Sequence, residues 1–212
     1  MDRIVVSHHK AMAMVEADAP GLFAMVSSLS RREHMRVPGL YLVPEALPNA
    51  LVAQDARGAE ILLTAGLLRT LSSAELAAVI AHQISLIKNR EALTMTIAAG
   101  YAILFTATAL LSPIAGWVAR FAAPHAVRFG ADASGAHLVG DALPLVRALQ
   151  KMEPQRSQEP AGSSLLSTAH LCICPPAAPE QSGSMRGTHP AVADRIGRLE
   201  ALSLRPLPSV RS

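Results

Sequence analysis

The 212-residue sequence predicts a mainly helical α+β domain with a small antiparallel sheet and an apolar helical run. Three observations lead to this fold class. Apolar residues recur at helical spacing over much of the chain, short strand-like runs lie between residues 37 and 64, and one long stretch contains no charge. Half of the residues are hydrophobic and 17% are charged, which is more typical of helical or membrane-associated proteins than of an average soluble enzyme.

The N-terminal third predicts helices followed by the sheet. Residues 9 to 35 have the spacing of one or two amphipathic helices, with an interruption at Pro20-Gly21. The runs VPGLYLVPE, NALVAQ and AEILLT predict three strands, and the sequence DARG predicts a turn between the last two.

A long helix is expected next, because Ser72 and Glu75 have the spacing of a capping box. Nothing breaks the helical pattern before Gly100, so we expect this helix to continue directly into the uncharged stretch. Further helices are predicted around residues 126–140, 141–153 and 189–202, with a polar loop at 153–164 and a short strand in AHLCICPP. Residues 203–212 are expected to be a disordered tail.

The uncharged stretch covers the 28 residues from Ala92 to Ala119. About 20 apolar residues are enough to cross a bilayer. Lys88 and Arg90 precede the stretch, and Trp117 lies near its far end. We therefore predict that residues 92–119 contact a membrane; a buried core helix is the alternative.

Charge and cysteine content exclude several classes of protein. The net charge is +3, but the basic residues are scattered and lack interleaved aromatic residues, so no nucleic-acid partner is expected. Cys172 and Cys174 are too close in sequence to bridge each other easily, and they lack the second pair of a structural zinc site. The N-terminus has no continuous apolar segment of the kind found in signal peptides.

Residues 75–91, ELAAVIAHQISLIKNRE, have the frame of a His-Glu-x-x-His helix. In that motif two histidines on one helix face bind zinc, and the glutamate takes a proton from the zinc-bound water. Here the motif reads His82-Gln83-Ile84-Ser85-Leu86. Glutamine cannot accept that proton, and leucine cannot bind a metal.

Four motifs occur in the order found in the HtpX family of membrane zinc metallopeptidases. In chain order they are PNALVA, GLLRTLSSAELAAVIAHQISLIKNRE, RFGADASGAHLVGD and GTHPAVADRIGRLEAL. The chain therefore resembles a degenerate member of that family. The resemblance implies a zincin-like, peptidase-like domain over residues 1–202, with an apolar membrane-contact segment at 92–119. Because the fold brings the second and third motifs together, an apolar hairpin broken at Ser112-Pro113 fits better than a single membrane span.

The resemblance also implies roles for five positions. His82 matches the first zinc-binding histidine and is the only intact ligand position. Gln83 stands at the position of the catalytic glutamate, and Leu86 at that of the second histidine. Arg128 stands at the position of the third ligand, a glutamate. Asp132 matches an aspartate that is expected to orient a ligand histidine.

Two ways of filling the emptied site follow from the spacing of these residues. His82 and His125 with another group could rebuild a metal site, whereas His137 and His189 are expected to have structural roles. Alternatively, Arg128 and Asp132 lie at positions i and i+4 and are expected to pair, with His82 and Gln83 as hydrogen-bond partners.

The resulting functional expectation is a membrane-associated pseudopeptidase without a cofactor, which acts by binding or regulation. Its expected partners are the membrane and either an active paralogous peptidase or segments of membrane proteins. The expected peptide-binding edge strand comprises Asn49, Ala50, Leu51 and Val52. The alternatives are an active zinc metalloendopeptidase with non-standard ligands, acting in membrane protein quality control, and a purely structural membrane subunit. The positive residues that flank the apolar run favour the bacterial inner membrane, with the domain facing the cytoplasm.

Overall fold

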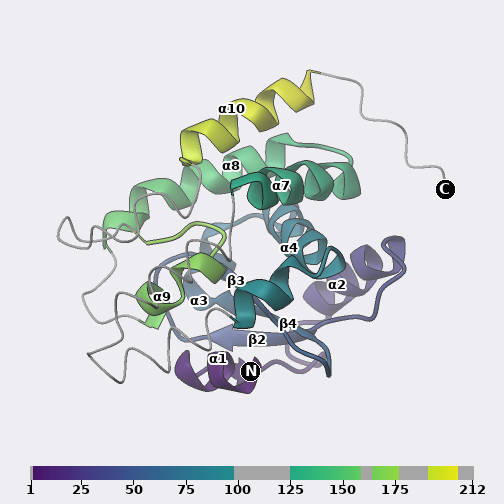
Figure 1. The fold of residues 1–212 in the computed structure, drawn as a ribbon, viewed down its shortest axis with the longest axis vertical. Coiled ribbons are helices and arrows are strands. Elements are labelled where there is room, and N and C mark those ends of the chain that lie inside the picture. The colour runs from purple at the N-terminus through teal and green to yellow at the C-terminus, as the bar shows by residue number, and fades with distance from the viewer. Residues whose placement is uncertain (1, 98–124, 159–163, 177–190, 205–212) are drawn as a thin grey trace.

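The computed structural model describes residues 2–97, 125–158, 164–176 and 191–204 (Figure 1). The central element is helix α4 (Ser73–Lys88). Further α-helices in the described ranges are α1 (Asp2–His8), α2 (Pro20–Arg32), α3 (Ala65–Thr70), α7 (His125–Val139), α8 (Leu143–Met152), α9 (Ser164–Ser167) and α10 (Val192–Ser203). The strands are β1 (Met12–Ala13), β2 (Gly39–Val43), β3 (Ala50–Gln54) and β4 (Ala59–Thr64), and the 3-10 helices are η2 (Glu153–Gln158) and η3 (Ala169–Leu171).

The sheet has the strand order β1-β2-β4-β3 and is mixed. β1 pairs with β2 and β3 with β4 in antiparallel fashion, but β2 and β4 are parallel. The expectation of an antiparallel sheet was therefore wrong for the central pair, because β3 folds to the outside and leaves β4 beside β2. Ile61, Leu62 and Leu63 of β4 are all fully buried, as expected for a strand covered on both faces.

Helix α4 lies between the sheet and the C-terminal helices. It contacts β3 and β4 on one side and α7 and α8 on the other, while α10 covers α7 and α8 (Figure 1). Helix α1 contacts β3 and β4 from the opposite side of the sheet. Every residue of α4 from Ala78 to Ile87 is buried, which is the pattern of a helix enclosed on all sides.

The predicted capping box is present at the start of α4. The Ser72 backbone N–H donates to Glu75 Oε2 at 2.8 Å, and the Glu75 N–H donates to Ser72 Oγ at 3.4 Å. Lys151 Nζ on α8 also donates to Glu75 Oε2, at 2.7 Å. The cap therefore fixes both the start of α4 and its contact with α8.

Helix α4 ends earlier than the sequence pattern suggested. Asn89 caps it by donating its N–H to the Ser85 carbonyl at 3.2 Å, and Arg90 has a left-handed φ of 59°. The expectation of one continuous helix into the apolar run was wrong, because this left-handed residue turns the chain before a separate helical segment at 91–97. Pro20 likewise starts α2 at its first turn and does not interrupt a helix.

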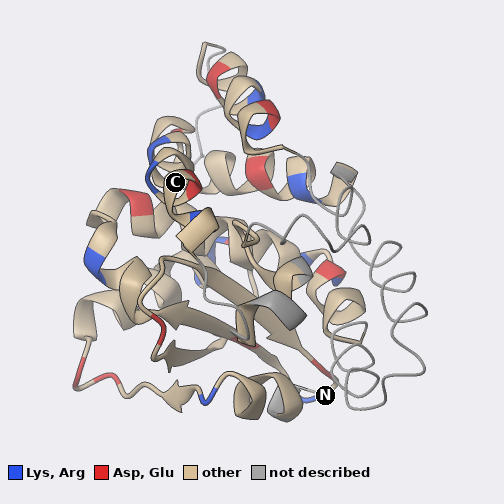
Figure 2. Ribbon diagram, turned by 90° about the vertical axis from the view of Figure 1, so that its left-hand side faces the viewer, with Lys and Arg blue, Asp and Glu red and all other residues tan. Residues whose placement is uncertain are grey.

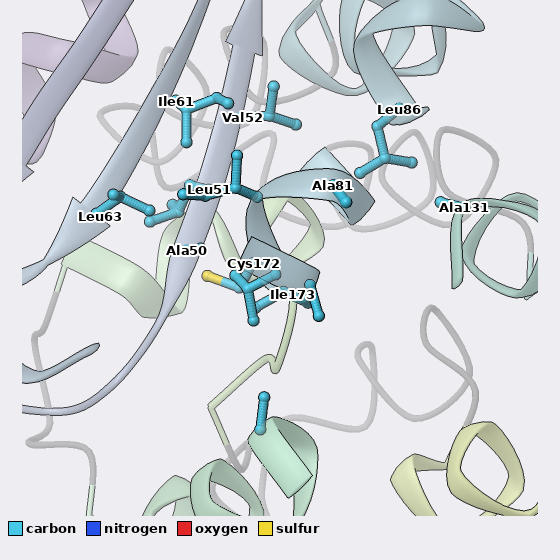
Figure 3. Packing of buried hydrophobic residues seen from close by; sticks show 14 of the residues in the cluster. Ala50, Leu51, Val52, Ile61, Leu63, Ala81, Leu86, Ala131, Cys172 and Ile173 are labelled. Atoms are coloured by element: carbon cyan, nitrogen blue, oxygen red, sulfur yellow. The ribbon is translucent and has the colours of Figure 1, made fainter. Parts of the chain in front are cut away.

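Figure 3 shows the hydrophobic core between the sheet and the helices. Leu51 and Val52 of β3 lie in one cluster with Ala81 and Leu86 of α4, and Cys172 and Ile173 lie beside β3. The expected strand in AHLCICPP is reduced to the helix η3 and one isolated bridge between Leu51 and Cys172. Charged residues lie mainly on the helices and connections around this core (Figure 2).

Within the described ranges, no helix is both long enough and apolar enough to cross a bilayer. Most of the predicted membrane-contact segment, residues 98–119, lies outside the described residues, as do Ser112-Pro113, Trp117 and the tail from residue 205. The membrane contact, the domain limits and the disordered tail therefore stay predictions.

Candidate active site

Helices α4 and α7 approach each other closely at a glycine. A Cβ on Gly135 of α7 would lie 2.8 Å from the backbone N of His82 and 3.0 Å from its Cα. The absent side chain therefore allows the backbone of α7 to lie directly against the predicted zinc-binding histidine.

His82 is fully buried, and its Nδ1 lies 2.8 Å from Oδ1 of Asp132. The predicted role of Asp132 in orienting a histidine fits this geometry. Burial lowers the pKa of His82 to about 4, although the Asp132 carboxylate opposes the shift. The neutral ring thus places Nδ1 close to Asp132, but neither Nδ1 nor Nε2 makes a hydrogen bond of good geometry to a described residue.

Asp132 is held from its other side by Arg195 of α10. Arg195 Nε donates to Oδ2 at 2.8 Å and Nη2 donates to Oδ1 at 2.7 Å, so the ion pair is bidentate. Burial alone would raise the pKa of Asp132, but the charge and hydrogen bonds of Arg195, with a contribution from His82, hold it well below its usual range. Nη1 of Arg195 also donates to the Ile173 carbonyl, at 2.5 Å.

This arrangement corrects one expectation from the sequence. Asp132 and Arg128 were expected to pair along α7, but Asp132 pairs with Arg195 and His82. The reason is that Asp132 faces both α4 and α10, and Arg195 satisfies both of its carboxylate oxygens. A continuous polar connection, His82–Asp132–Arg195–Ile173, therefore links α4, α7 and α10 to the segment beside β3.

Gln83 and Leu86 follow His82 on α4, and both are fully buried. Leu86 belongs to the hydrophobic core. Neither amide atom of Gln83 has a hydrogen-bond partner among the described residues. A carboxamide can donate and accept hydrogen bonds, but it cannot serve as a general base near neutral pH.

Arg128 is fully buried in the first half of α7. Its Nη2 lies 3.9 Å from the Met95 sulfur. Burial, with a contribution from the charge of Arg195, lowers the pKa of Arg128 to about 10, so the guanidinium stays protonated at neutral pH. Glu91 offsets part of this charge; burial raises the pKa of its carboxyl, and Arg128 lowers it.

The other candidate ligands lie elsewhere or outside the described side chains. His125 is the first residue of α7, but its side chain is not described, and His189 lies outside the described residues. His137 is half-buried near the surface, beside Ser85 and Asn89. Cys172 and Cys174 are buried thiols that form no disulfide, and burial raises the pKa of Cys174 to about 12.

The predicted peptide-binding strand does lie at an edge of the sheet, because β3 is the last strand in the order. Other parts of the chain contact this edge. The Ile173 N–H donates to the Ala50 carbonyl at 2.9 Å, and Asn49 Nδ2 donates to the Cys174 carbonyl at 2.6 Å. Leu51 and Val52 are fully buried. A peptide added beside Asn49–Leu51 would have to displace residues 172–174.

The side chains at the four catalytic positions do not fit a zinc ion. Among the described residues, no group of three or more His, Cys, Asp or Glu side chains is arranged to hold a metal. Of the four positions, only His82 carries a lone pair suited to zinc, whereas a catalytic zinc site needs three protein ligands. Arg128 adds a fixed positive charge where the family has an anionic ligand.

Arg195 is the site residue that sequence reasoning missed. It lies on the buried face of α10 together with Val192 and Leu199, at positions i, i+3 and i+7 of the same stripe. An arginine within an apolar stripe is the sequence signal that could have identified it, because a buried guanidinium needs a buried anion.

The chain matches the sequence profile of Peptidase family M48 over residues 16–203. It belongs to this family, whose members are zincin-like metallopeptidases. It is 30% identical to the Protease HtpX homolog of Syntrophobacter fumaroxidans over 233 aligned residues, covering 95% of this chain and 83% of that protein. It is 33% identical to the Protease HtpX homolog of Paenarthrobacter aurescens, covering 97% and 80% of the two chains.

The fold is also similar to that of the S. mikatae protein Ste24p. The TM-score is 0.58 at 16% identity, and the match covers 93% of this chain and 53% of the Ste24p chain. This chain thus spans about half the length of that relative, and the likeness concerns the fold alone. The resemblance to HtpX-type peptidases and the zincin-like fold inferred from the sequence are confirmed.

Proposed function

We propose that this member of Peptidase family M48 has lost zinc binding and proteolysis and acts at a membrane by binding or regulation. The observation that carries the proposal is the fully buried guanidinium of Arg128 at the position of the third zinc ligand. An arginine cannot be deprotonated easily even where burial lowers its pKa to about 10. A divalent cation at the same place would meet an unfavourable charge in a region of low dielectric constant.

Two further side chains support the proposal independently of charge. Leu86 has no lone pair, so no rotamer of its side chain can bind a metal. It is also fully buried in the hydrophobic core. Gln83 retains the shape of a glutamate without its basicity. Loss of the base alone would abolish water activation even if a metal were bound.

What remains of the site has a structural role on this proposal. Asp132 and Arg195 join α7 to α10, and the contact of Asp132 with His82 joins α7 to α4. These links preserve the zincin-like arrangement without requiring a metal. The proposed means of action are contact with the membrane and binding of an active paralogous peptidase or a membrane-protein segment. Binding at the β3 edge would in addition require residues 172–174 to move away.

The direct test measures zinc in the purified full-length chain by plasma mass spectrometry, together with casein cleavage with and without a chelator. We expect well below about 0.1 zinc per chain, against about one in a catalytic zinc site, and no cleavage. Stoichiometric zinc or chelator-sensitive cleavage would overturn the proposal in favour of an active peptidase with other ligands.

A second variant tests whether the scaffold is preserved. The triple substitution Gln83→Glu, Leu86→His and Arg128→Glu restores all the family's donor types on α4 and α7. We expect this variant to bind about one zinc ion per chain. If it folds, as judged by circular dichroism, and still binds no zinc, then α4 and α7 do not hold the catalytic geometry.

A further inference from the structure

A basic pocket of about 530 Å³ lies at the C-terminal end of α4. Three segments line it: the connection from α2 to β2 (residues 33–37), the turn between β3 and β4 (residues 57–60), and the end of α4 (residues 87–90). None of the lining residues belongs to the four catalytic positions.

Positive charge dominates this pocket. Its lining includes four basic residues, Arg36, Arg57, Lys88 and Arg90, and two acidic ones, Glu33 and Glu60. Lys88 forms an ion pair with Glu33, which removes one charge of each sign. The guanidinium groups of Arg36, Arg57 and Arg90 are exposed, and no hydrogen bond or ion pair to a described residue engages them.

The backbone brings these arginines together from distant parts of the sequence. Arg90 has a left-handed φ of 59°, and His34 has a φ of 53°, so both segments turn sharply at the pocket. Gly58 leaves the third side open, because a Cβ there would meet no atom within 4 Å. The result is a concave site lined by three guanidinium groups that no residue in the described ranges pairs.

The start of the uncharged stretch lies beside the pocket, because Gln54, which lines the pocket, donates its N–H to Thr96 Oγ1 at 2.9 Å. Arg90 lies two residues before Ala92, and the described part of the stretch leaves Ile97 41% exposed. Val37, which lines the pocket, is 43% exposed. Cationic side chains therefore adjoin apolar ones, as they do where a protein meets a charged headgroup and the acyl chains below it.

We propose that this pocket binds a phosphate-bearing anion, supplied by the headgroup of an anionic phospholipid. Guanidinium groups bind phosphate oxygens in a bidentate manner, and three of them around one pocket match a phosphodiester and its neighbouring headgroup oxygens. This site does not depend on the loss of zinc binding, so either proposal can fail without the other.

Vesicle flotation of the full-length chain tests the proposal. The vesicles contain phosphatidylcholine alone or phosphatidylcholine mixed with phosphatidylglycerol. The pocket variant carries Arg36→Gln, Arg57→Gln and Arg90→Gln. The control variant carries Arg31→Gln, Arg69→Gln and Arg147→Gln, three exposed arginines elsewhere on the surface that remove the same net charge.

We expect the wild-type chain and the control variant to prefer the anionic vesicles. In the pocket variant the ratio of binding to anionic over neutral vesicles should fall at least about tenfold, because each arginine near the membrane surface raises the affinity for anionic lipid several-fold. Apolar insertion alone would give equal binding to both kinds of vesicle, so the comparison isolates the headgroup contribution.

Calorimetric titration with glycerol phosphate and with inorganic phosphate distinguishes the source of the anion. One outcome is that the wild-type chain binds these soluble anions, the pocket variant does not, and both bind vesicles equally. That outcome would support the anion site and assign it to a soluble phosphate. If the pocket and control variants behave alike in both the vesicle and the solution experiments, the proposal is overturned.

Discussion

Replacing Gly135 by alanine tests whether the close approach of α7 to His82 organises the site. The new Cβ would lie 2.8 Å from the His82 backbone N and 3.2 Å from the carbonyl carbon of Ala81, whereas ordinary van der Waals contact begins near 3.4 Å. Because the contacted atoms are main chain, α4 and α7 must separate by about half an ångström or more, and such overpacking typically costs about 1–3 kcal/mol.

Gly130 on the same helix supplies the matched control. It is exposed, and a Cβ there would meet nothing within 4 Å. Both substitutions gain the same helix propensity of about 1 kcal/mol, so their difference isolates the steric cost of about 1–3 kcal/mol. Gly130→Ala should therefore raise the free energy of unfolding. The free energy of unfolding of Gly135→Ala should be lower than that of Gly130→Ala by the steric cost.

The measurement is urea unfolding followed by circular dichroism, with thermal midpoints as a second readout. In a chain of this size each kcal/mol corresponds to about 2–4 °C. If Gly135→Ala is as stable as Gly130→Ala, helices α4 and α7 do not meet closely at His82, and the proposed geometry of the site is wrong.

Three other perturbations test separate parts of the fold. Arg195→Met removes the bidentate partner of the buried Asp132 carboxylate and should lower the free energy of unfolding in urea by about 3–5 kcal/mol. The same change at the exposed Arg198 should lower it by no more than about 1 kcal/mol. Equal losses in the two variants would contradict the ion pair. His9 and His82 both have a pKa lowered by burial from 6.5 to about 4, so the unfolded chain binds more protons and stability should fall, by up to about 3 kcal/mol per histidine, as the pH drops from about 6.5 to 4. A flat stability profile over that window would mean that these rings are hydrated. Ser72→Ala removes the capping oxygen of α4 and should lower the unfolding free energy by about 0.5–2 kcal/mol, and no change would mean that water replaces the cap.

Local sequence signals predicted the helices that carry the site. The Ser72–Glu75 spacing identified the start of α4, and the periodic pattern around Asp132 and Arg195 identified α7 and α10. The end of α4 was missed because the break is conformational: Asn89 and Arg90 stop the helix without a proline or glycine. The parallel pairing of β2 and β4 was missed because strand order depends on contacts between segments that are distant in sequence.

The candidate site shows the same division between local and long-range information. Motif spacing located His82, Gln83, Leu86 and Arg128 on two helices, and the structure places these two helices against each other. The same spacing gave the wrong partner for Asp132, because it pointed only to Arg128 on the same helix. Arg195 of α10, 63 residues further along the chain, has the geometry to satisfy both carboxylate oxygens.

Charge balance explains how the scaffold could tolerate the proposed loss of zinc. In the family, the third position carries a glutamate of charge −1 beside a zinc ion of charge +2, which together contribute +1. Arg128 contributes +1 by itself, so at the third position the formal charge is the same with no metal, whereas Gln83 removes the further −1 of the catalytic glutamate. On the proposed function, Arg128 therefore replaces the combined charge of the glutamate and the zinc, and Leu86 occupies the place of the second histidine with an apolar side chain. On this reasoning Arg128→Glu alone leaves the third position two positive charges short, and the balance there returns only when a zinc ion binds, which also requires Leu86→His as a second histidine ligand.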